Sequence, residues 1–188
     1  MLHADSGMKE GTPDIQHAGA LAFAAHSILL VGDTLGAAVF AFDTGDGQAT
    51  SGGKSTNIEG FNQKIAAMMG SYTEETVIND IAVNPLSGNL YLSVARGRGP
   101  DSMPVIFRTD SKVTLSELSL KKVKFRKATI ANAHEPKEGK RNPRMSVVTD
   151  MQYKDGQVFV AGLSNVLLVA STATGSAGRQ DIRTIDLP

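Results

Sequence analysis

Apolar and polar positions repeat three times along this chain in the same order. Each copy has three short apolar runs that are separated by turn residues such as Asn, Pro, Gly, Asp and Ser. The runs are 20–23, 27–33 and 37–43 in the first copy, 80–83, 88–94 and 104–110 in the second, and 150–153, 156–162 and 166–171 in the third. Runs of this length between turns are typical of β-strands, so the pattern predicts a repeat protein of three antiparallel units.

A fourth strand is predicted at the end of each unit. The segments are 55–59 for the first unit, 111–120 for the second, where Val113, Leu115, Leu118 and Leu120 recur, and 181–187 for the third. Four antiparallel strands in a repeated unit form one blade of a β-propeller. The predicted fold is therefore all-β, with three four-stranded blades at about 17–60, 76–120 and 145–188. They form a single domain over 17–188, after a flexible lead over 1–16.

Three blades cannot close a propeller, since closed propellers have 4–8. An open stack of three blades exposes two apolar faces, which a monomer in water does not tolerate. Two copies related by a two-fold axis would form a six-bladed ring, so the sequence predicts a half propeller that is completed by homodimerisation.

Two segments between the blades have their own patterns. Residues 61–69 place apolar side chains at helical spacing and precede Gly70, so they predict one short connecting helix. A packed connector is the favoured interpretation, and a lid over the central opening is the alternative. Residues 121–127 contain five basic residues around Val123 and Phe125. This pattern favours a solvated edge strand over a phosphate-binding stripe.

Composition narrows the class of protein. Nineteen basic residues balance nineteen acidic ones, so no overall charge favours nucleic acid. The chain has no Cys, which excludes disulfides, thiolate metal sites and a Cys nucleophile. The first residues do not resemble a signal peptide, and no apolar run is long enough to span a bilayer. We therefore expect a cytoplasmic protein without nucleic-acid or membrane partners.

The second unit carries a family resemblance. Its segments Ile78-Asn-Asp-Ile-Ala-Val-Asn-Pro85 and Gly88-Asn-Leu-Tyr-Leu-Ser93 resemble the six-bladed superfamily of NHL-repeat, strictosidine-synthase-like, gluconolactonase-like and paraoxonase-like propellers. The resemblance covers roughly 17–44, 76–120 and 145–171. Members of that superfamily carry about twice as many blades in one chain. We therefore expect a shortened relative of a longer propeller, with an altered reading frame near the end as the hypothesis for its small-residue-rich tail.

The entrances of the three innermost strands supply the candidate site, because such strands line the central channel of a propeller. Asn79 and Asp80 in the second blade occupy the same columns as Thr149 and Asp150 in the third, and His17 precedes the corresponding place in the first. In the gluconolactonase-like and paraoxonase-like enzymes, Asn, Asp and Glu at this level bind a divalent metal, often calcium. The resemblance therefore implies metal ligands at Asn79, Asp80 and Asp150, with His17 as a further candidate. Alternatively, these Asx side chains cap local turns.

The donor types decide which metal and which reaction fit. Oxygen ligands suit calcium, whereas imidazole with carboxylates suits zinc. His17, His134 and Asp150 are the candidate catalytic residues, with His134 as a general base over the channel. The resulting hypothesis is a metal-dependent hydrolase of lactones or esters, with phosphotriesters as promiscuous small-molecule substrates. The alternative is a non-catalytic propeller scaffold that binds a protein or ligand through residues 121–127 or the loop at 96–99.

Overall fold

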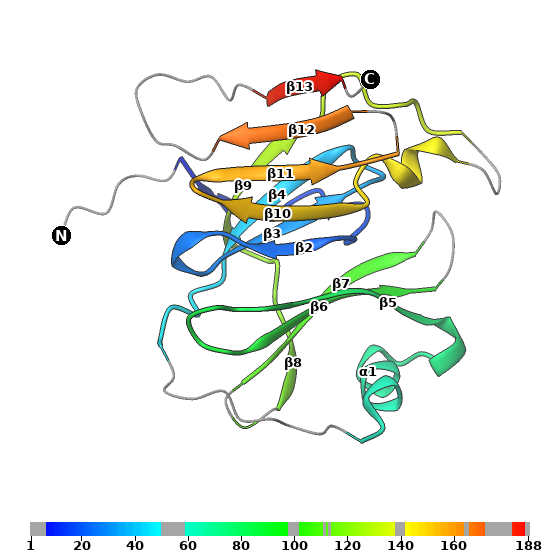
Figure 1. Ribbon diagram of the computed structural model, residues 1–188. Coiled ribbons are helices and arrows are strands. Elements are labelled where there is room, and N and C mark those ends of the chain that lie inside the picture. Colours follow the sequence, from blue (N-terminus) through cyan, green and yellow to red (C-terminus); the bar gives the residue numbers. More distant parts are fainter. Residues whose placement is uncertain are drawn as a thin grey trace.

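Three antiparallel β-sheets and one α-helix make up the part of the chain that the structure describes (Figure 1). The computed structural model describes residues 7–49, 59–97, 102–110, 112, 114–137, 142–163, 166–171 and 182–186. The sheets confirm the all-β prediction at the level of fold class. No helix within these ranges is long and apolar enough to cross a membrane.

The first sheet has five strands in the order β1-β9-β4-β3-β2. Its strands are β1 (Lys9–Gly11), β2 (Leu21–Phe23), β3 (Ile28–Asp33), β4 (Ala38–Asp43) and β9 (Val123–Thr129). The three apolar runs predicted for the first unit are thus strands β2, β3 and β4. The segment 55–59, which the sequence predicts as the fourth strand, lies largely outside the described residues. Strand β9, which comes after the whole second sheet, pairs with β4 instead.

Strand β9 corrects the interpretation of residues 121–127 as an edge strand. It lies between β4 and β1, and the segment expected to be a flexible lead supplies β1. The reason is packing, because Phe125 is buried with its ring centroid 6.2 Å from that of Phe40. The basic side chains cover this aromatic cluster, and Lys127 Nζ lies 5.2 Å from the centroid of the Phe40 ring.

The second sheet has four strands in chain order, β5 (Thr76–Val83), β6 (Leu90–Arg96), β7 (Met103–Thr109) and β8 (Leu115–Glu117). Helix α1 (Phe61–Met69) packs on one face of it, where Ile65 is buried against Leu92, Val94 and Phe107. The helix ends at Gly70 in the left-handed conformation with φ 60°, as the sequence predicts. Helix α1 is therefore a packed connector.

The third sheet also has four strands in chain order, β10 (Asp150–Lys154), β11 (Gln157–Ala161), β12 (Val166–Ser171) and β13 (Ile182–Asp186). Asp155 and Gly156 join β10 to β11 and both have positive φ, 50° and 79°. Two positive φ values in a two-residue loop are typical of the type I′ turn that favours Asp-Gly.

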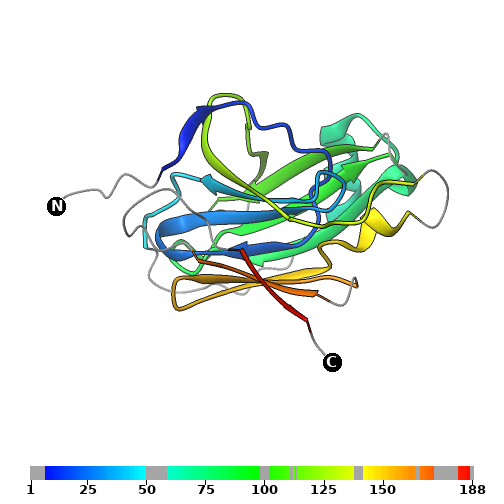
Figure 2. The same ribbon diagram turned by 90° about the horizontal axis from the view of Figure 1, so that it is seen from above.

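The sheets stack with the first one in the middle (Figures 1 and 2). Strand β2 contacts β10 on one side and β5 on the other, so the spatial order is third, first, second. Ala22 of β2 and the preceding Ala20 pack against Val148, Met151 and the third sheet. The opposite face of the first sheet packs Leu29, Val31 and Phe40 against the second sheet. The first sheet is therefore buried on both faces.

Candidate functional site

Asn79 and Asp80 tie the second sheet to the first. Asn79 Nδ2 donates to the Ala18 carbonyl oxygen at 2.8 Å. Asp80 Oδ2 accepts the Leu21 amide N–H at 2.7 Å, and Asp80 Oδ1 accepts the amide N–H of Ile81 at 2.8 Å. Both carboxylate oxygens of Asp80 therefore have backbone donors as partners.

A β-bulge explains how two consecutive side chains of β5 reach the same neighbouring sheet. The register between β5 and β6 shifts between Ile78 and Asp80, which leaves Asn79 without a partner on β6. In a regular strand, consecutive side chains point to opposite faces, whereas a bulge redirects one of them. The bulge thus brings Asn79 and Asp80 together over the segment that leads into β2.

His17 lies in the same segment and has an unusual environment. Its Nδ1 is buried and has no hydrogen-bond partner among the described residues. Burial lowers the pKa of the imidazole below its ordinary value of 6.5, and the nearby Asp33 carboxylate opposes that shift. Gly19 lies under the ring, because a Cβ there would approach His17 Cε1 to 3.4 Å. The structure therefore holds His17 as a neutral, partly buried imidazole.

Asp33, the last residue of β3, is fully buried. Its Oδ1 accepts the amide N–H groups of His17 at 3.0 Å and Gly36 at 2.8 Å, and its Oδ2 accepts that of Gln16 at 2.9 Å. A carboxylate with three backbone donors holds the chain rather than a ligand. Asp33 fastens the segment before β2 to the turn between β3 and β4.

Asp150 and His134 lie apart from this group. Asp150 is exposed at the start of β10, on the far side of β2 from β5, and accepts the amide N–H of Met151 at 2.8 Å. The preceding Thr149 donates its hydroxyl to the Ala161 carbonyl oxygen at 3.1 Å within the third sheet. His134 is exposed in the loop before η3 (Pro143–Ser146), where its carbonyl oxygen accepts from Arg144 Nη1 at 2.6 Å.

The structure therefore brings His17, Asn79 and Asp80 to one corner and leaves Asp150 and His134 outside it. Within the described ranges, no three His, Cys, Asp or Glu residues are grouped so that they could hold a metal ion. The alternative, in which these Asx side chains cap local turns, describes only the bond of Asp80 with Ile81, since the bonds to Ala18 and Leu21 reach across to the first sheet. A metal at this site stays a prediction.

A polar network that the sequence does not predict centres on Asp46. Its Oδ2 accepts from Ser87 Oγ at 2.7 Å, from Tyr91 Oη at 3.0 Å and from Asn89 Nδ2 at 3.0 Å. Asn84 Nδ2 donates to the Asp46 carbonyl oxygen at 2.8 Å. The network joins the loop after β4 to the β5–β6 turn and so fastens the first sheet to the second.

Tyr91 is the buried aromatic member of this network. Its side chain is fully buried, and burial raises the pKa of its hydroxyl above the ordinary value of 10.0. The side chains of Thr44 and Arg108 lie close to this hydroxyl and oppose part of the rise in its pKa. The polar cluster in the turn Asn84-Pro-Leu-Ser-Gly-Asn89 is the sequence signal for this network, because buried Asn and Ser side chains need partners.

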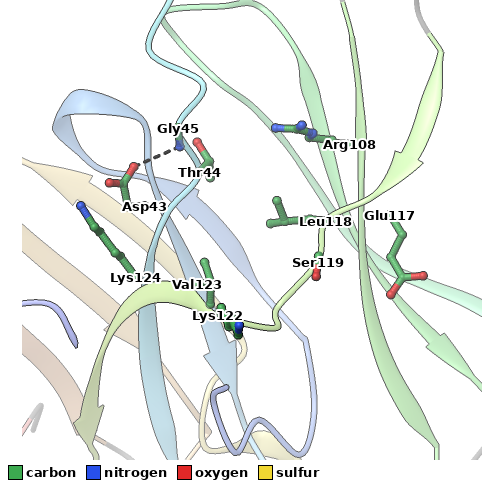
Figure 3. Close-up of a pocket in the computed structure, with 10 residues that line it drawn as sticks. All are labelled: Asp43, Thr44, Gly45, Arg108, Glu117, Leu118, Ser119, Lys122, Val123 and Lys124. Carbon is green, nitrogen blue, oxygen red and sulfur yellow. Dashed lines mark hydrogen bonds between the residues drawn. The ribbon is translucent and has the colours of Figure 1, made fainter. Parts of the chain in front are cut away.

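A surface groove with a volume of about 440 Å³ lies next to this network, between the first and second sheets (Figure 3). Its walls come from the end of β4, from β7 and from the β8–β9 connection. The lining residues are Asp43, Thr44, Gly45, Arg108, Glu117, Leu118, Ser119, Lys122, Val123 and Lys124. Such a volume is in the range of small-molecule sites.

No protein-family model matches this chain, and the comparison with curated proteins finds no match.

Proposed function

We propose that this chain is a non-catalytic scaffold of the β-propeller type that binds a ligand or a partner protein. The observation that carries the proposal is the use of Asp80, whose two carboxylate oxygens accept amide N–H groups across and within the sheets. A carboxylate with these partners stabilises the junction of the two sheets and is oriented by backbone donors. The groove beside Arg108 remains open for binding.

The scaffold proposal includes the architecture and the assembly. We propose that the three sheets act as blades and that a second copy of the chain completes a six-bladed ring. Ile81 and Val83 on β5 support this proposal, because they are 52% and 54% exposed on the face that carries α1. Exposed apolar residues on a sheet face are typical of an interface. The cytoplasmic location that the sequence predicts stays a prediction.

The molecular mass in solution tests the assembly. One chain has a mass of 19.8 kDa, so light scattering at micromolar concentration should give twice that value. Val83→Lys places a charge on the exposed face and should shift the mass to that of one chain. Glu10→Lys, on the edge strand β1, is the control and should leave the mass unchanged. A wild-type protein with the mass of one chain rules out the ring.

A metal-dependent hydrolase is the second candidate function, and one observation favours it. His17 Nδ1 is buried without a partner, and the pKa of the ring is lowered, so a neutral imidazole is available as a ligand or base. Asn79 lies beside it through the contact with Ala18. A divalent metal there would polarise the carbonyl or phosphoryl group of a lactone, ester or phosphotriester.

Elemental analysis with hydrolase assays separates the two functions. The scaffold proposal expects purified protein without stoichiometric calcium or zinc, and no turnover of a lactone, an ester or a phosphotriester. It also expects His17→Gln to leave these measurements unchanged. One metal per chain that is lost in His17→Gln and in Asn79→Ala, together with hydrolysis, would establish the hydrolase instead.

A further inference from the structure

The groove between the first and second sheets has a cationic lining that lacks carboxylate partners. Arg108, Lys122 and Lys124 line it, and none of them forms a salt bridge with another described residue. Arg108 is half-buried, and Figure 3 shows its guanidinium directed across the groove toward Thr44. A half-buried guanidinium without an anion is incompletely compensated, because burial weakens its hydration.

The two carboxylates in the lining, Asp43 and Glu117, do not pair with Arg108. Asp43 Oδ1 accepts the amide N–H of Gly45 at 3.0 Å, so the Asp43 side chain is held against its own loop. Glu117 points away from the middle of the groove (Figure 3). Arg108 therefore extends into the groove without a carboxylate opposite it, and Lys122 and Lys124 are further cations in the lining, which favours an anion there.

Arg108 lies next to the buried network. Its side chain is close enough to the Tyr91 hydroxyl to affect the pKa of that group, and the hydroxyl donates to Asp46 Oδ2 at 3.0 Å. A binding residue that packs beside a fixed network loses less conformational freedom when a ligand arrives. The planar guanidinium is suited to bidentate contact with a phosphate or carboxylate.

Apolar side chains lie next to the cations. Leu118 is nearly buried, at 9% exposure, and its side chain points into the groove in Figure 3, with Val123 nearby on β9. The groove thus offers an apolar surface beside a cationic one. Sites of this kind bind small molecules that have one anionic group and an apolar body.

We propose that this groove binds a small molecule with a phosphate or carboxylate head on an apolar body. Arg108 contacts the head, Lys122 and Lys124 add attraction, and Leu118 contacts the body. The inference rests on the proposed scaffold function, since it names the class of ligand that the scaffold would take.

Titration followed by ¹H–¹⁵N NMR tests the inference with three probes of similar size. Phenyl phosphate and benzoate carry the two candidate heads, and phenol carries neither. At least one of the two anions should shift the amide signals of Thr44, Gly45 and Ser119 saturably, and phenol should not. The stronger anion identifies the head. Added salt should weaken the binding, because partly exposed charges are screened.

Two variants and a matched control locate the site. Arg108→Gln should weaken binding of the effective anion about tenfold or more, as expected for loss of a charge-assisted bond. Lys122→Gln, in an exposed turn, should weaken it less and keeps the test valid if Arg108→Gln fails to fold. Lys121→Gln removes the same charge one residue away without lining the groove and should bind like the wild type.

Three results would overturn the inference: no saturable shift with either anion, equal binding of phenol, or binding that Arg108→Gln and Lys122→Gln leave unchanged. None of these results affects the scaffold proposal, which fails if the metal and hydrolase measurements succeed, and whose ring assembly fails if the wild-type protein has the mass of one chain. The two proposals can therefore be rejected separately.

Discussion

The Asp80 carboxylate accepts the amide N–H of Leu21 at 2.7 Å, and this bond joins β5, an edge strand of the second sheet, to β2, an edge strand of the first. Asp80 and the bulge beside it thus act at the junction of the sheets. Loss of that carboxylate should therefore destabilise the contact between the two sheets.

Asp80→Ala should lower the free energy of unfolding by about 1–3 kcal/mol, because it leaves the Leu21 and Ile81 N–H groups without their acceptor. Urea unfolding measures the change. Asp150→Ala is the matched control, since the exposed Asp150 carboxylate accepts only from the adjacent Met151, and its effect should stay within about 0.5 kcal/mol. Equal losses in the two variants would contradict the role given to Asp80.

Gly32→Ala should destabilise the protein by about 1–3 kcal/mol through overpacking between the first and third sheets. A Cβ at Gly32 would approach Val148 Cγ1 to 2.6 Å. Gly47→Ala is the control, since a Cβ there meets only Ser27 Oγ, at 4.0 Å.

The double variant Gly32→Ala with Val148→Ala provides a second check on this contact. The smaller side chain at 148 makes room for the new methyl group, so the double variant should lose less stability than the sum of the two single variants. Strict additivity would mean that the third sheet does not pack on Gly32.

Stability should fall as the pH is lowered through the region below about 6.5, the ordinary pKa of histidine. Burial lowers the pKa of His17 in the folded protein, so between that pKa and 6.5 the unfolded chain binds more protons than the folded one. The contribution is fully present above 6.5 and is lost as the pH falls to the folded pKa. The Asp33 carboxylate, which favours the charged ring, reduces the size of the effect.

His17→Gln should flatten this part of the profile of urea midpoint against pH. His26→Gln, at an exposed position, should leave the slope as it is in the wild type. If the slope survives in His17→Gln, another group is responsible for it.

Tyr91→Phe should lower the free energy of unfolding by about 1.5–3 kcal/mol, because it removes the hydroxyl that donates to the Asp46 carboxylate. Tyr153→Phe is the control, since the hydroxyl of the half-buried Tyr153 makes no hydrogen bond with the described residues. Thermal or urea unfolding measures both variants. If the two variants have similar free energies of unfolding, the Asp46 network does not stabilise the contact between the first and second sheets.

The strands of the fold could be predicted from sequence because their signal is local. Alternation of apolar residues and turn residues identify β2 to β8 and β10 to β13 within a few residues, and Gly70 identifies the end of α1. The position of β9 could not be predicted in this way. Its basic and apolar alternation fits any half-exposed strand, and only the buried contact of Phe125 with Phe40 and Phe42 determines where it pairs.

The candidate site could be predicted only in part. Comparison of the strand entrances groups Asp150 with Asn79 and Asp80, but Asp150 lies elsewhere in the structure, whereas Asn79 and Asp80 contact the segment that follows His17. It could not show that their polar atoms are used by backbone groups. It also could not reveal the groove at Arg108, whose lining comes from three segments that are separate in the chain.

The pairing of β4 with β9 has a consequence for synthesis of the protein. On the ribosome, the first sheet lacks β9, the last of its five strands to be made, until residue 129 has left the exit tunnel, by which time the second sheet has been made in full. The exposed edge of β4 during that interval is a site for wrong pairing with other nascent chains. We therefore expect β2, β3 and β4 to need chaperones for a longer time during synthesis. The comparison is with a protein in which each sheet is completed before the next one begins.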